Sequence, residues 1–439
     1  MQTKLLLLLP LLLAGLVSAG SLESYRAEWA ALRPKLDADI ERYRKGDATI
    51  ELVDANGNAV TNAVLEIRQK KHAFLFGCNI LPLGQLGELN EPYEKAFVKL
   101  FNLATTTFCW SSIEPEPGRL RFEEGSEEIW RRPPPDRVVA FGKKHGLALK
   151  GQPLGLVWYP SWAPKEPEQA KQAYQAWFAK MAGRYGHEFM IVDVVNEALS
   201  HPNSKHCLYS SDMAFVAWMF QQAKRYFPPE TLLAINDGTN MNGWNRDRYF
   251  QLVKRLVEHD AGVSAVGFQF HLFGLLSHFQ GKLLPASQLL ETYDQFGQLG
   301  LPLFITEITI PSTVRPGADG EALQAEAVVN LYQLWFSVPK MAGIIYWNLP
   351  DGTAHGNEGR VLAGLLDAQM REKPAYQALC QLIHRKWNTQ VQAISDAQGK
   401  ASFRGFYGTY DIVVTIGDKT QTFEVRLAKD TSIIQLKLK

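Results

Sequence analysis

The chain has 439 residues, of which 46% are hydrophobic and 21% are charged, and these proportions are typical of a folded protein rather than a disordered one. Lys and Arg (46) almost balance Asp and Glu (45), which leaves a formal net charge of +1. This balance argues against nucleic acid or an anionic membrane as a partner. The length is sufficient for one large domain and a small one.

The first 19 residues have the pattern of a secretory signal peptide. One Lys precedes an apolar run, and the run ends in the small residues Val17-Ser18-Ala19. We predict cleavage after Ala19 and a secreted protein, extracellular or periplasmic. The alternative is a membrane anchor, but the run is short and Pro10 interrupts it. No later segment has about 18 consecutive apolar residues, so we expect no membrane association after cleavage.

Residues 20–71 form a predicted N-terminal flank. Apolar residues at helical spacing predict a helix over 22–45, which Pro34 should bend or split. Residues 48–69 read as two strands around an Asn56-Gly57 turn.

Short apolar runs then alternate with helix-length segments, among them 170–184, 212–225, 247–258 and 322–336. Eight such βα units predict a closed parallel (β/α)8 barrel, a TIM barrel in the α/β class, over residues 72–384. The alternative is an open doubly wound sheet, which usually carries a Gly-rich phosphate loop after its first strand. The sequence after residue 80 matches such a loop poorly. The predicted strands are 72–80, 101–110, 147–158, 189–197, 232–238, 264–273, 301–310 and 343–352.

Residues 385–439 show alternating apolar residues and tight Gly turns, which predict a small antiparallel β unit. We expect it to pack with the strands of 48–69, because two strands alone are only marginally stable.

The four cysteines have long, irregular spacings, and no C-x-x-C pair indicates a zinc site. Cys78 and Cys109 end adjacent strand-like runs, and whether they form a disulfide stays open.

Two carboxylates follow predicted barrel strands. The run IVDVVNEA ends in Asn196-Glu197, and Glu307 lies in FITE on the seventh strand. A barrel brings the C-terminal ends of its strands to one face, where active sites lie. Two facing carboxylates are the groups that cleave a glycosidic bond, and in a retaining enzyme they stand about 5–5.5 Å apart. For Glu197 the alternative is a helix cap or a solvent-facing side chain.

Neighbouring residues suggest a role for each carboxylate. Glu307 lies on a stiff strand, which suits a nucleophile, so we assign Glu197 as the acid/base. His271 can tune a carboxylate, and Asn196 can contact a sugar 2-hydroxyl. Asp193 shares a strand face with Glu197 and can support the site from below.

The strings DVVNEA, GFQFH and FITE, in this order and at these spacings, resemble glycoside hydrolase family 10, the endo-β-1,4-xylanase family. The resemblance covers roughly residues 72–384. It implies a retaining enzyme on a (β/α)8 barrel, with the acid/base after strand four, the nucleophile after strand seven and no cofactor. The implied partner is a polysaccharide or oligosaccharide, with xylan expected. The flanking strings IRQKKHAFLFG and FRGFYGTYDI resemble small β elements around the barrel in some plant and bacterial members.

Other strand-end residues are candidate substrate contacts. We assign this role to Trp158, Trp347, Gln269 and Gln152, besides Asn196 and His271. Trp110 and Trp158 are either core aromatics or sugar contacts, and we favour contact. For Asn236-Asp237 we favour a helix cap over a ligand contact. Glu114 and Glu116 lie in a Pro-rich turn, and we expect them to be structural. The C-terminal β unit lacks an obvious row of exposed Trp, so we expect it to brace the barrel.

The sequence departs from the family pattern in three places. Phe108 and Cys109 stand before Trp110, where the family usually has Asn and Lys. Gln152 replaces a His in the strand-three motif, which continues here as Val157-Trp158-Tyr159, and the strand-eight loop lacks a second Trp. These departures concern substrate recognition. They leave open a different β-glycan, a decorated oligosaccharide or a non-catalytic carbohydrate-binding protein. Endo or exo action and the oligomeric state also stay open.

Overall fold

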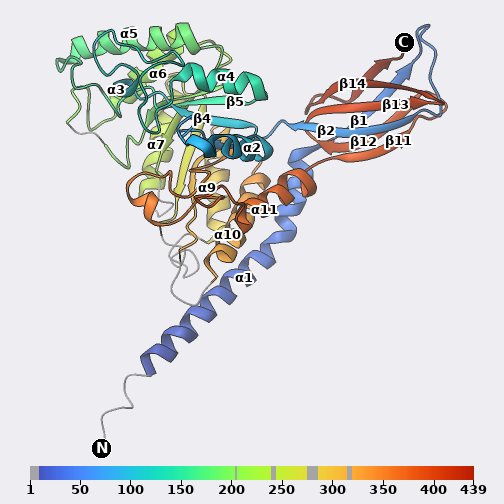
Figure 1. Ribbon diagram of the computed structural model, residues 1–439, viewed down its shortest axis with the longest axis horizontal. Coiled ribbons are helices and arrows are strands. Elements are labelled where there is room, and N and C mark those ends of the chain that lie inside the picture. The colour runs from blue at the N-terminus through green and yellow to red at the C-terminus, as the bar shows by residue number, and fades with distance from the viewer. Residues whose placement is uncertain (1–8, 203–204, 239–243, 274–284, 314–318) are drawn as a thin grey trace, which may run out of the picture.

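The computed structural model describes residues 9–202, 205–238, 244–273, 285–313 and 319–439, and its central feature is a closed parallel barrel (Figure 1). The strands follow one another around the barrel in chain order, and β10 closes onto β3. The predicted (β/α)8 barrel is therefore confirmed. Its strands are β3 (Leu75–Asn79), β4 (Leu103–Thr107), β5 (Ala148–Gln152), β6 (Ile191–Asn196), β7 (Leu232–Asp237), β8 (Ala265–His271), β9 (Leu303–Thr309) and β10 (Met341–Tyr346).

Helices cover the outside of the barrel, and each of the four helical segments predicted between strands is present. The longer ones are α2 (Asn90–Leu100), α4 (Pro135–His145), α5 (Pro167–Tyr185), α6 (Ala214–Tyr226), α7 (Trp244–Glu258), α9 (Ala286–Gly297), α10 (Gly320–Ser337) and α11 (Pro374–Gln381). Shorter helical turns are η1 (Gly87–Leu89), α3 (Trp110–Ile113), η2 (Gly356–Arg360) and η3 (Leu382–Lys386).

The barrel interior changes from apolar to polar along its axis. Seven of the eight strands contribute one residue each to a buried apolar cluster, most of them from the N-terminal half of the strand. Toward the C-terminal ends, buried polar side chains such as Lys150, Asp193, Asn236 and Thr306 replace them. Polar groups buried at this depth need partners, and they form the base of the site described below. The apolar cluster comprises Leu75, Leu103, Ile191, Ala234, Ala265, Phe304 and Ile345.

The N-terminal flank begins with a long helix, α1 (Leu9–Arg44), which packs along α10. The helix is continuous through Pro34, so the expected split is wrong. Contacts to α10 lie on both sides of the proline: Arg26 pairs with Glu326 at 2.8 Å, and Gln333 Nε2 donates to Asp37 at 2.7 Å. Anchoring at both ends holds the helix together, while Pro34 itself is exposed. Within the described residues, we find no helix with the length and apolarity needed to cross a membrane.

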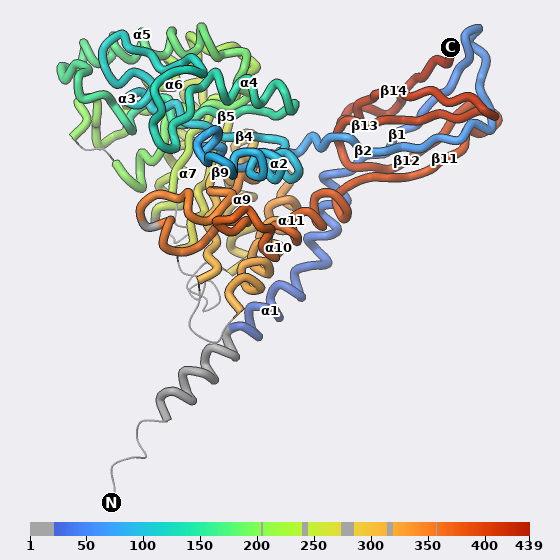
Figure 2. Tube along the Cα trace, viewed as in Figure 1, coloured from blue at the N-terminus to red at the C-terminus, as the bar shows by residue number. Residues whose placement is uncertain are grey.

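Strands from both ends of the chain build one accessory β unit, as predicted (Figure 2). Its two sheets enclose a core of their own, which includes Ile50, Leu65, Phe403 and Ile412. One sheet has the order β12 (Lys400–Phe406), β1 (Lys45–Val53), β15 (Ile433–Lys437); the other has the order β11 (Gln390–Ile394), β2 (Val64–His72), β13 (Gly408–Ile416), β14 (Lys419–Leu427).

Two details of the β unit differ from expectation. The strands on either side of the Asn56-Gly57 turn, β1 and β2, do not pair with each other but enter different sheets. In addition, β1 pairs with β15 in parallel, so the unit is not wholly antiparallel. Ten residues separate β1 from β2, which lets the chain cross from one sheet to the other instead of closing a tight hairpin.

All four cysteines are free thiols, so the bridge between Cys78 and Cys109 that the sequence left open is not formed. Both of these residues are buried at the ends of barrel strands. Burial raises the pKa of the Cys109 thiol to about 11, although the nearby Arg132 guanidinium opposes the shift.

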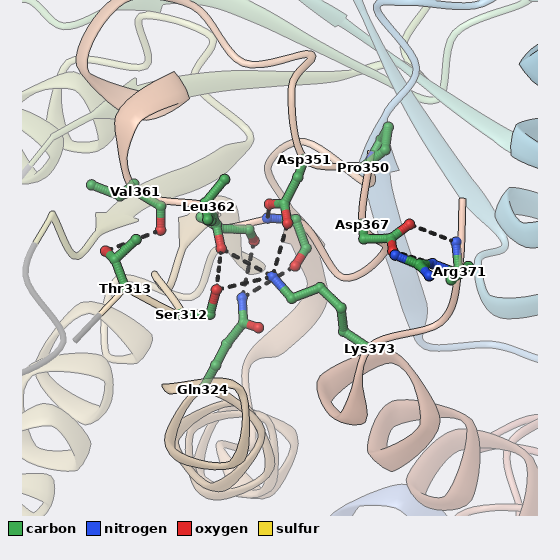
Figure 3. A network of polar contacts seen from close by, with 12 residues as sticks. Ser312, Thr313, Gln324, Pro350, Asp351, Val361, Leu362, Asp367, Arg371 and Lys373 are labelled. Atoms are coloured by element: carbon green, nitrogen blue, oxygen red, sulfur yellow. Dashed lines mark hydrogen bonds and ion pairs between the residues drawn. The ribbon is translucent and has the colours of Figure 1, made fainter. Parts of the chain in front are cut away.

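The connection from β10 to α11 is fixed around the buried ammonium of Lys373 (Figure 3). Lys373 Nζ donates to Ser312 Oγ (3.1 Å), Asp351 Oδ2 (3.1 Å) and the Leu362 carbonyl (3.0 Å). Gln324 of α10 donates to the carbonyl of Ile310 at 2.7 Å and to carbonyls of the same connection. The segment after β9 and the long connection after β10 are thereby joined at the C-terminal face of the barrel.

Replacing Lys373 by Met leaves the Asp351 carboxylate buried without its cation, and we expect the free energy of unfolding to fall by about 3 kcal/mol. Denaturant unfolding followed by circular dichroism measures this change. The matched control is Lys386→Met, because the exposed Lys386–Asp37 pair contributes less than about 1 kcal/mol. Equal effects of the two substitutions would contradict this account of the Lys373 network.

Candidate active site

The Glu307 carboxylate at the C-terminal face of the barrel has four side-chain hydrogen-bond partners. It lies on β9 with 4% of its surface exposed. Its Oε1 accepts from Gln152 Nε2 (2.6 Å), Asn236 Nδ2 (3.0 Å) and Gln269 Nε2 (3.0 Å). Its Oε2 lies 3.3 Å from His271 Nε2. Donors from β5, β7 and β8 therefore converge on one buried carboxylate.

These donors keep Glu307 ionised. Burial by itself raises the pKa of the carboxyl, but the hydrogen bond and charge of His271, the charge of Lys150 and the Gln152 amide outweigh it, so the pKa is lowered overall. The pKa of His271 moves in the opposite direction: burial lowers it, and Glu307 more than compensates. Since His271 Nδ1 is also hydrogen-bonded to Thr309 Oγ1 at 2.7 Å, the ring is held from both sides.

Glu197 follows β6 in an unusual backbone conformation. Its φ is +58°, in the left-handed region that non-glycine residues rarely adopt. Its N–H donates to the Asn236 carbonyl at 2.8 Å, and its carbonyl accepts from the His201 N–H at 3.2 Å. Strain of this kind persists only where the surroundings hold the residue in place, and it is frequent in active sites.

The two carboxylates share one hydrogen-bond donor. Gln269 Nε2 lies 2.9 Å from Glu197 Oε1 and 3.0 Å from Glu307 Oε1. These oxygens are therefore at most about 5.9 Å apart, the sum of the two distances. Carboxyl groups of inverting glycosidases stand about 6.5–9.5 Å apart, and those of retaining enzymes about 5–5.5 Å. The upper limit of about 5.9 Å between these two oxygens is smaller than the separations in the inverting enzymes.

The pKa of Glu197 is shifted upward, opposite to that of Glu307. Burial is the largest cause, the Gln269 amide opposes it, and the negative charge of Glu307 raises it further. His201 Nδ1 lies 3.4 Å from Glu197 Oε2 and lowers the pKa when it is protonated. The surroundings of the two carboxyl groups therefore shift their pKa values apart, so Glu197 holds a proton more readily than Glu307 does.

Asn236 is a site residue that sequence reasoning assigned to a helix cap. The fully buried side chain donates to Glu307 and to Asn196 Oδ1 (2.8 Å), and its Oδ1 accepts from Thr306 Oγ1 (2.6 Å). The neighbouring Asp237 accepts from the backbone N–H groups of Leu199 (2.8 Å) and Ser200 (3.0 Å), so it fixes the turn after Glu197. A polar pair at a strand end was the only sequence signal for this role.

A buried ion pair supports the site from below, where the sequence placed Asp193. Lys150 pairs with Asp193, and both side chains are inaccessible to solvent. Lys150 Nζ also donates to Gln152 Oε1 at 2.8 Å. Because an ammonium only donates, the Gln152 oxygen faces Lys150 and its amide N–H faces Glu307. Burial raises the pKa of Asp193 to about 6, although Lys150 opposes the shift.

The predicted aromatic contacts take three different positions. Trp158 is 53% exposed at the barrel face and has a φ of +64°. Trp347 is buried after β10, and its backbone N–H donates to the Ile308 carbonyl at 2.9 Å. The predicted sugar contact by Trp110 is wrong, because the side chain is 4% exposed and stacks on Trp177 with ring centroids 5.1 Å apart. Its indole N–H donates to Glu114 at 2.9 Å, so both residues belong to the core and the surrounding turn.

The polar residues predicted for the site therefore lie together: the two carboxylates, Asn196, Gln152, Gln269 and His271. A comparison with protein-family models matches residues 69–382 to Glycosyl hydrolase family 10. The chain belongs to glycosyl hydrolase family 10. The family match extends over the whole barrel, from the end of β2 to the end of α11.

Curated relatives carry different names. Anti-sigma-I factor RsgI6 of Acetivibrio thermocellus is 26% identical over 388 residues, which are 87% of this chain and 46% of the relative. Endo-1,4-beta-xylanase 2 of Arabidopsis thaliana is 23% identical over 403 residues, which are 85% of this chain and 33% of the relative. The chain thus spans less than half the length of these two relatives.

Solved structures match the barrel. The xylanase 10B of Thermotoga petrophila RKU-1, in complex with xylobiose, superposes with a TM-score of 0.60 at 21% identity and covers 72% of this chain and 95% of that one. The GH10 structure from Paenibacillus barcinonensis gives a TM-score of 0.58 at 19% identity, covering 71% and 96%. At these identities the match shows the barrel fold alone.

Glu307→Gln should lower the pKa of Glu197, because removing a nearby negative charge makes deprotonation easier. Nuclear magnetic resonance titration of protein labelled at the Glu side-chain carboxyl carbon measures this pKa directly. His201→Asn is the matched opposite: without the imidazolium, the pKa of Glu197 should rise. A rise after Glu307→Gln would show that the two carboxyl groups are not coupled as described.

Proposed function

We propose that this protein is a retaining glycoside hydrolase that cleaves β-1,4-glycosidic bonds in a polysaccharide, with xylan as the expected substrate. The observation that carries the proposal is the pair of carboxyl groups that share the Gln269 amide, lie within about 5.9 Å of each other and have oppositely shifted pKa values. Family membership supports the same reaction class.

In the first step, an ionised Glu307 oxygen attacks the anomeric carbon and forms a glycosyl ester. The bond to the leaving oxygen breaks at the same time, and Glu197 gives that oxygen its proton. His271, Asn236 and Gln152 hold the attacking group in one orientation, which reduces the entropy lost on reaching the transition state. Asn196, held by Asn236, is placed to bind the sugar 2-hydroxyl.

In the second step, Glu197 acts as the base. It takes a proton from a water molecule, whose oxygen attacks the anomeric carbon and displaces Glu307 as a carboxylate. Both groups return to their starting protonation states, and two inversions give net retention. The partial exposure of the Glu197 side chain, 24%, lets water reach it, whereas Glu307 is nearly covered.

The substrate assignment rests on the family and on relatives named endo-1,4-beta-xylanases. A second candidate, a carbohydrate-binding protein without turnover, is favoured by one observation: another relative is named an anti-sigma-I factor. The intact carboxylate pair supports hydrolysis over binding alone.

Glu307→Gln should abolish hydrolysis of xylan and of aryl glycosides alike, because no covalent intermediate forms. Glu197→Gln should lower xylan hydrolysis by about 10²–10⁴-fold, the usual contribution of general acid–base catalysis. On an aryl glycoside with an acidic leaving group the first step needs no proton, so Glu197→Gln should accumulate the intermediate in a burst. Azide, a nucleophile that needs no base, should restore its turnover.

A panel of β-glycans, with released sugars read by chromatography, tests the substrate. Xylo-oligosaccharides from the wild type alone support the proposal, whereas products from another glycan move the specificity and keep the mechanism. Binding without products from any substrate would overturn the hydrolase in favour of the binding protein. Nuclear magnetic resonance of the first-formed product reads its anomeric configuration, and an inverted product would refute the retaining mechanism.

We also propose that residues 1–19 are removed on export and that the protein acts outside the cytoplasm. The support is the signal-peptide pattern ending at Ala19. N-terminal sequencing of the protein secreted from its own host should give Gly20 as the first residue. Retention of Met1 in a membrane fraction would favour the anchor instead.

A further inference from the structure

The long connection between β4 and α4 carries an arginine with unused binding capacity. Arg132 is partly buried at the catalytic face, and its Nη1 donates to the Arg131 carbonyl at 2.9 Å. Among the described residues, no Asp or Glu forms an ion pair with it. Four acidic residues of the same connection form ion pairs with other cations. Glu114 pairs with Lys180, Glu116 and Glu127 pair with Arg119, and Glu128 pairs with Arg137. A guanidinium half-removed from water without a counter-ion is poised for an anionic partner.

Arg132 lies against an aromatic ring that remains open to solvent. Its guanidinium carbon is 5.4 Å from the ring centroid of Trp158, which is 53% exposed. Trp130, two residues before Arg132, is 50% exposed. Both tryptophans belong to connections that follow barrel strands, β4 and β5, so both lie on the C-terminal side of the barrel, and ligand sites are typically lined by aromatic side chains. A sugar presents apolar C–H groups that pack well on such rings.

This aromatic–cationic pair borders the catalytic carboxylates. The Leu154 N–H donates to the Asp193 carbonyl at 2.8 Å, so the connection that leads to Trp158 runs along β6. Leu156 and Val157 line the same small cavity as Glu197. On the other side, Arg132 contacts the thiol of Cys109, and the neighbouring Phe108 N–H donates to the Gln152 carbonyl at 2.6 Å. A bound glycan chain that reaches Glu197 and Glu307 therefore passes close to Arg132.

The strand-two segment itself offers nothing polar at this point. Phe108 and Cys109 are both buried. Arg132 brings a cation to the same place from a different part of the chain. A guanidinium differs from an ammonium in its planar fork, which matches both oxygens of a carboxylate.

We propose that Arg132 and Trp158 form a subsite for a sugar unit that carries a carboxylate, a uronic acid. The sugar ring packs on Trp158, and the free N–H groups of Arg132 donate to the carboxylate. The subsite rests on the proposed function, because it assumes that a glycan occupies the catalytic face. It makes the protein selective for acidic, uronate-bearing glycans over neutral ones.

The test compares two substrates, a linear xylo-oligosaccharide and the same oligosaccharide with one glucuronic acid branch. We expect the wild type to hydrolyse the acidic substrate with a kcat/KM at least about tenfold higher, the scale of one charge-assisted hydrogen bond. Arg132→Gln should bring this ratio close to one, and Arg132→Lys, which keeps the charge and loses the fork, should give an intermediate ratio. Raising the salt concentration should lower the wild-type ratio, because ions screen the attraction.

The matched control is Arg119→Gln. Arg119 belongs to the same connection but is paired with Glu116 and Glu127, so its loss should leave the ratio unchanged. If Arg132→Gln fails to fold, as judged by thermal unfolding, Arg132→Lys carries the comparison. A wild-type ratio at or below one, or a ratio that Arg132 substitutions do not change, would overturn the subsite.

Binding separates failure of the subsite from failure of the hydrolase. Calorimetry with the Glu307→Gln variant should give a dissociation constant for the acidic oligosaccharide at least about tenfold below that for the neutral one. If the wild type turns over neither substrate but binding keeps this Arg132-dependent preference, the hydrolase proposal fails and the subsite stands. If both are hydrolysed with the same ratio in every variant, the hydrolase stands and the subsite fails.

Discussion

The cost of burying the Glu307 carboxylate governs the architecture of the catalytic face. An isolated carboxylate away from water is prohibitively unfavourable, so β9 can carry Glu307 only if neighbouring strands supply donors. Three of the four donors are themselves held: Lys150 orients Gln152, Thr309 holds His271, and Asn196 and Thr306 fix Asn236. The polar upper layer of the barrel is therefore one connected network, and the apolar layer beneath it needs no such partners.

This network gives the carboxyl groups of Glu197 and Glu307 different pKa values. Glu307 receives four donors and a nearby ammonium charge, whereas Glu197 shares a single amide and faces the negative charge of Glu307. The same burial that raises both pKa values is overcome for one group only. The opposite pKa shifts of the two carboxyl groups are thus a consequence of how many donors and charges each position reaches.

Strand periodicity and polar strand ends were sufficient to predict the barrel and to bring its two carboxylates to one face. They could not predict the register shifts in the β6–β7 pairing between Asp193 and Val195 and in the β8–β9 pairing between Phe268 and Gln269. A bulge advances the alternation by one residue, so that Asn196 can share the inner face with Asp193. The role of Asn236 was missed for a related reason: an Asn at a strand end reads the same whether it caps a helix or supports a carboxylate. Trp110 was misassigned because strand position does not reveal the aromatic stack that covers it.

Closure of the barrel fixes the positions of the strands by pairing, but it does not fix the conformation of the connections between them. The residues around the two carboxylates are fixed by strand pairing and mutual hydrogen bonds. The connections after β4 and β10 are held instead by hydrogen bonds to each other. Arg131 Nη1 donates to Asn348 Oδ1 at 2.8 Å and to the Thr353 carbonyl, and Asn348 in turn donates to Glu358 at 3.0 Å. Lys373 ties the second connection to the end of β9. Because these two connections lie outside the strand pairing that fixes the carboxylates, a change of sequence in either can reshape the C-terminal face of the barrel without moving the carboxylates.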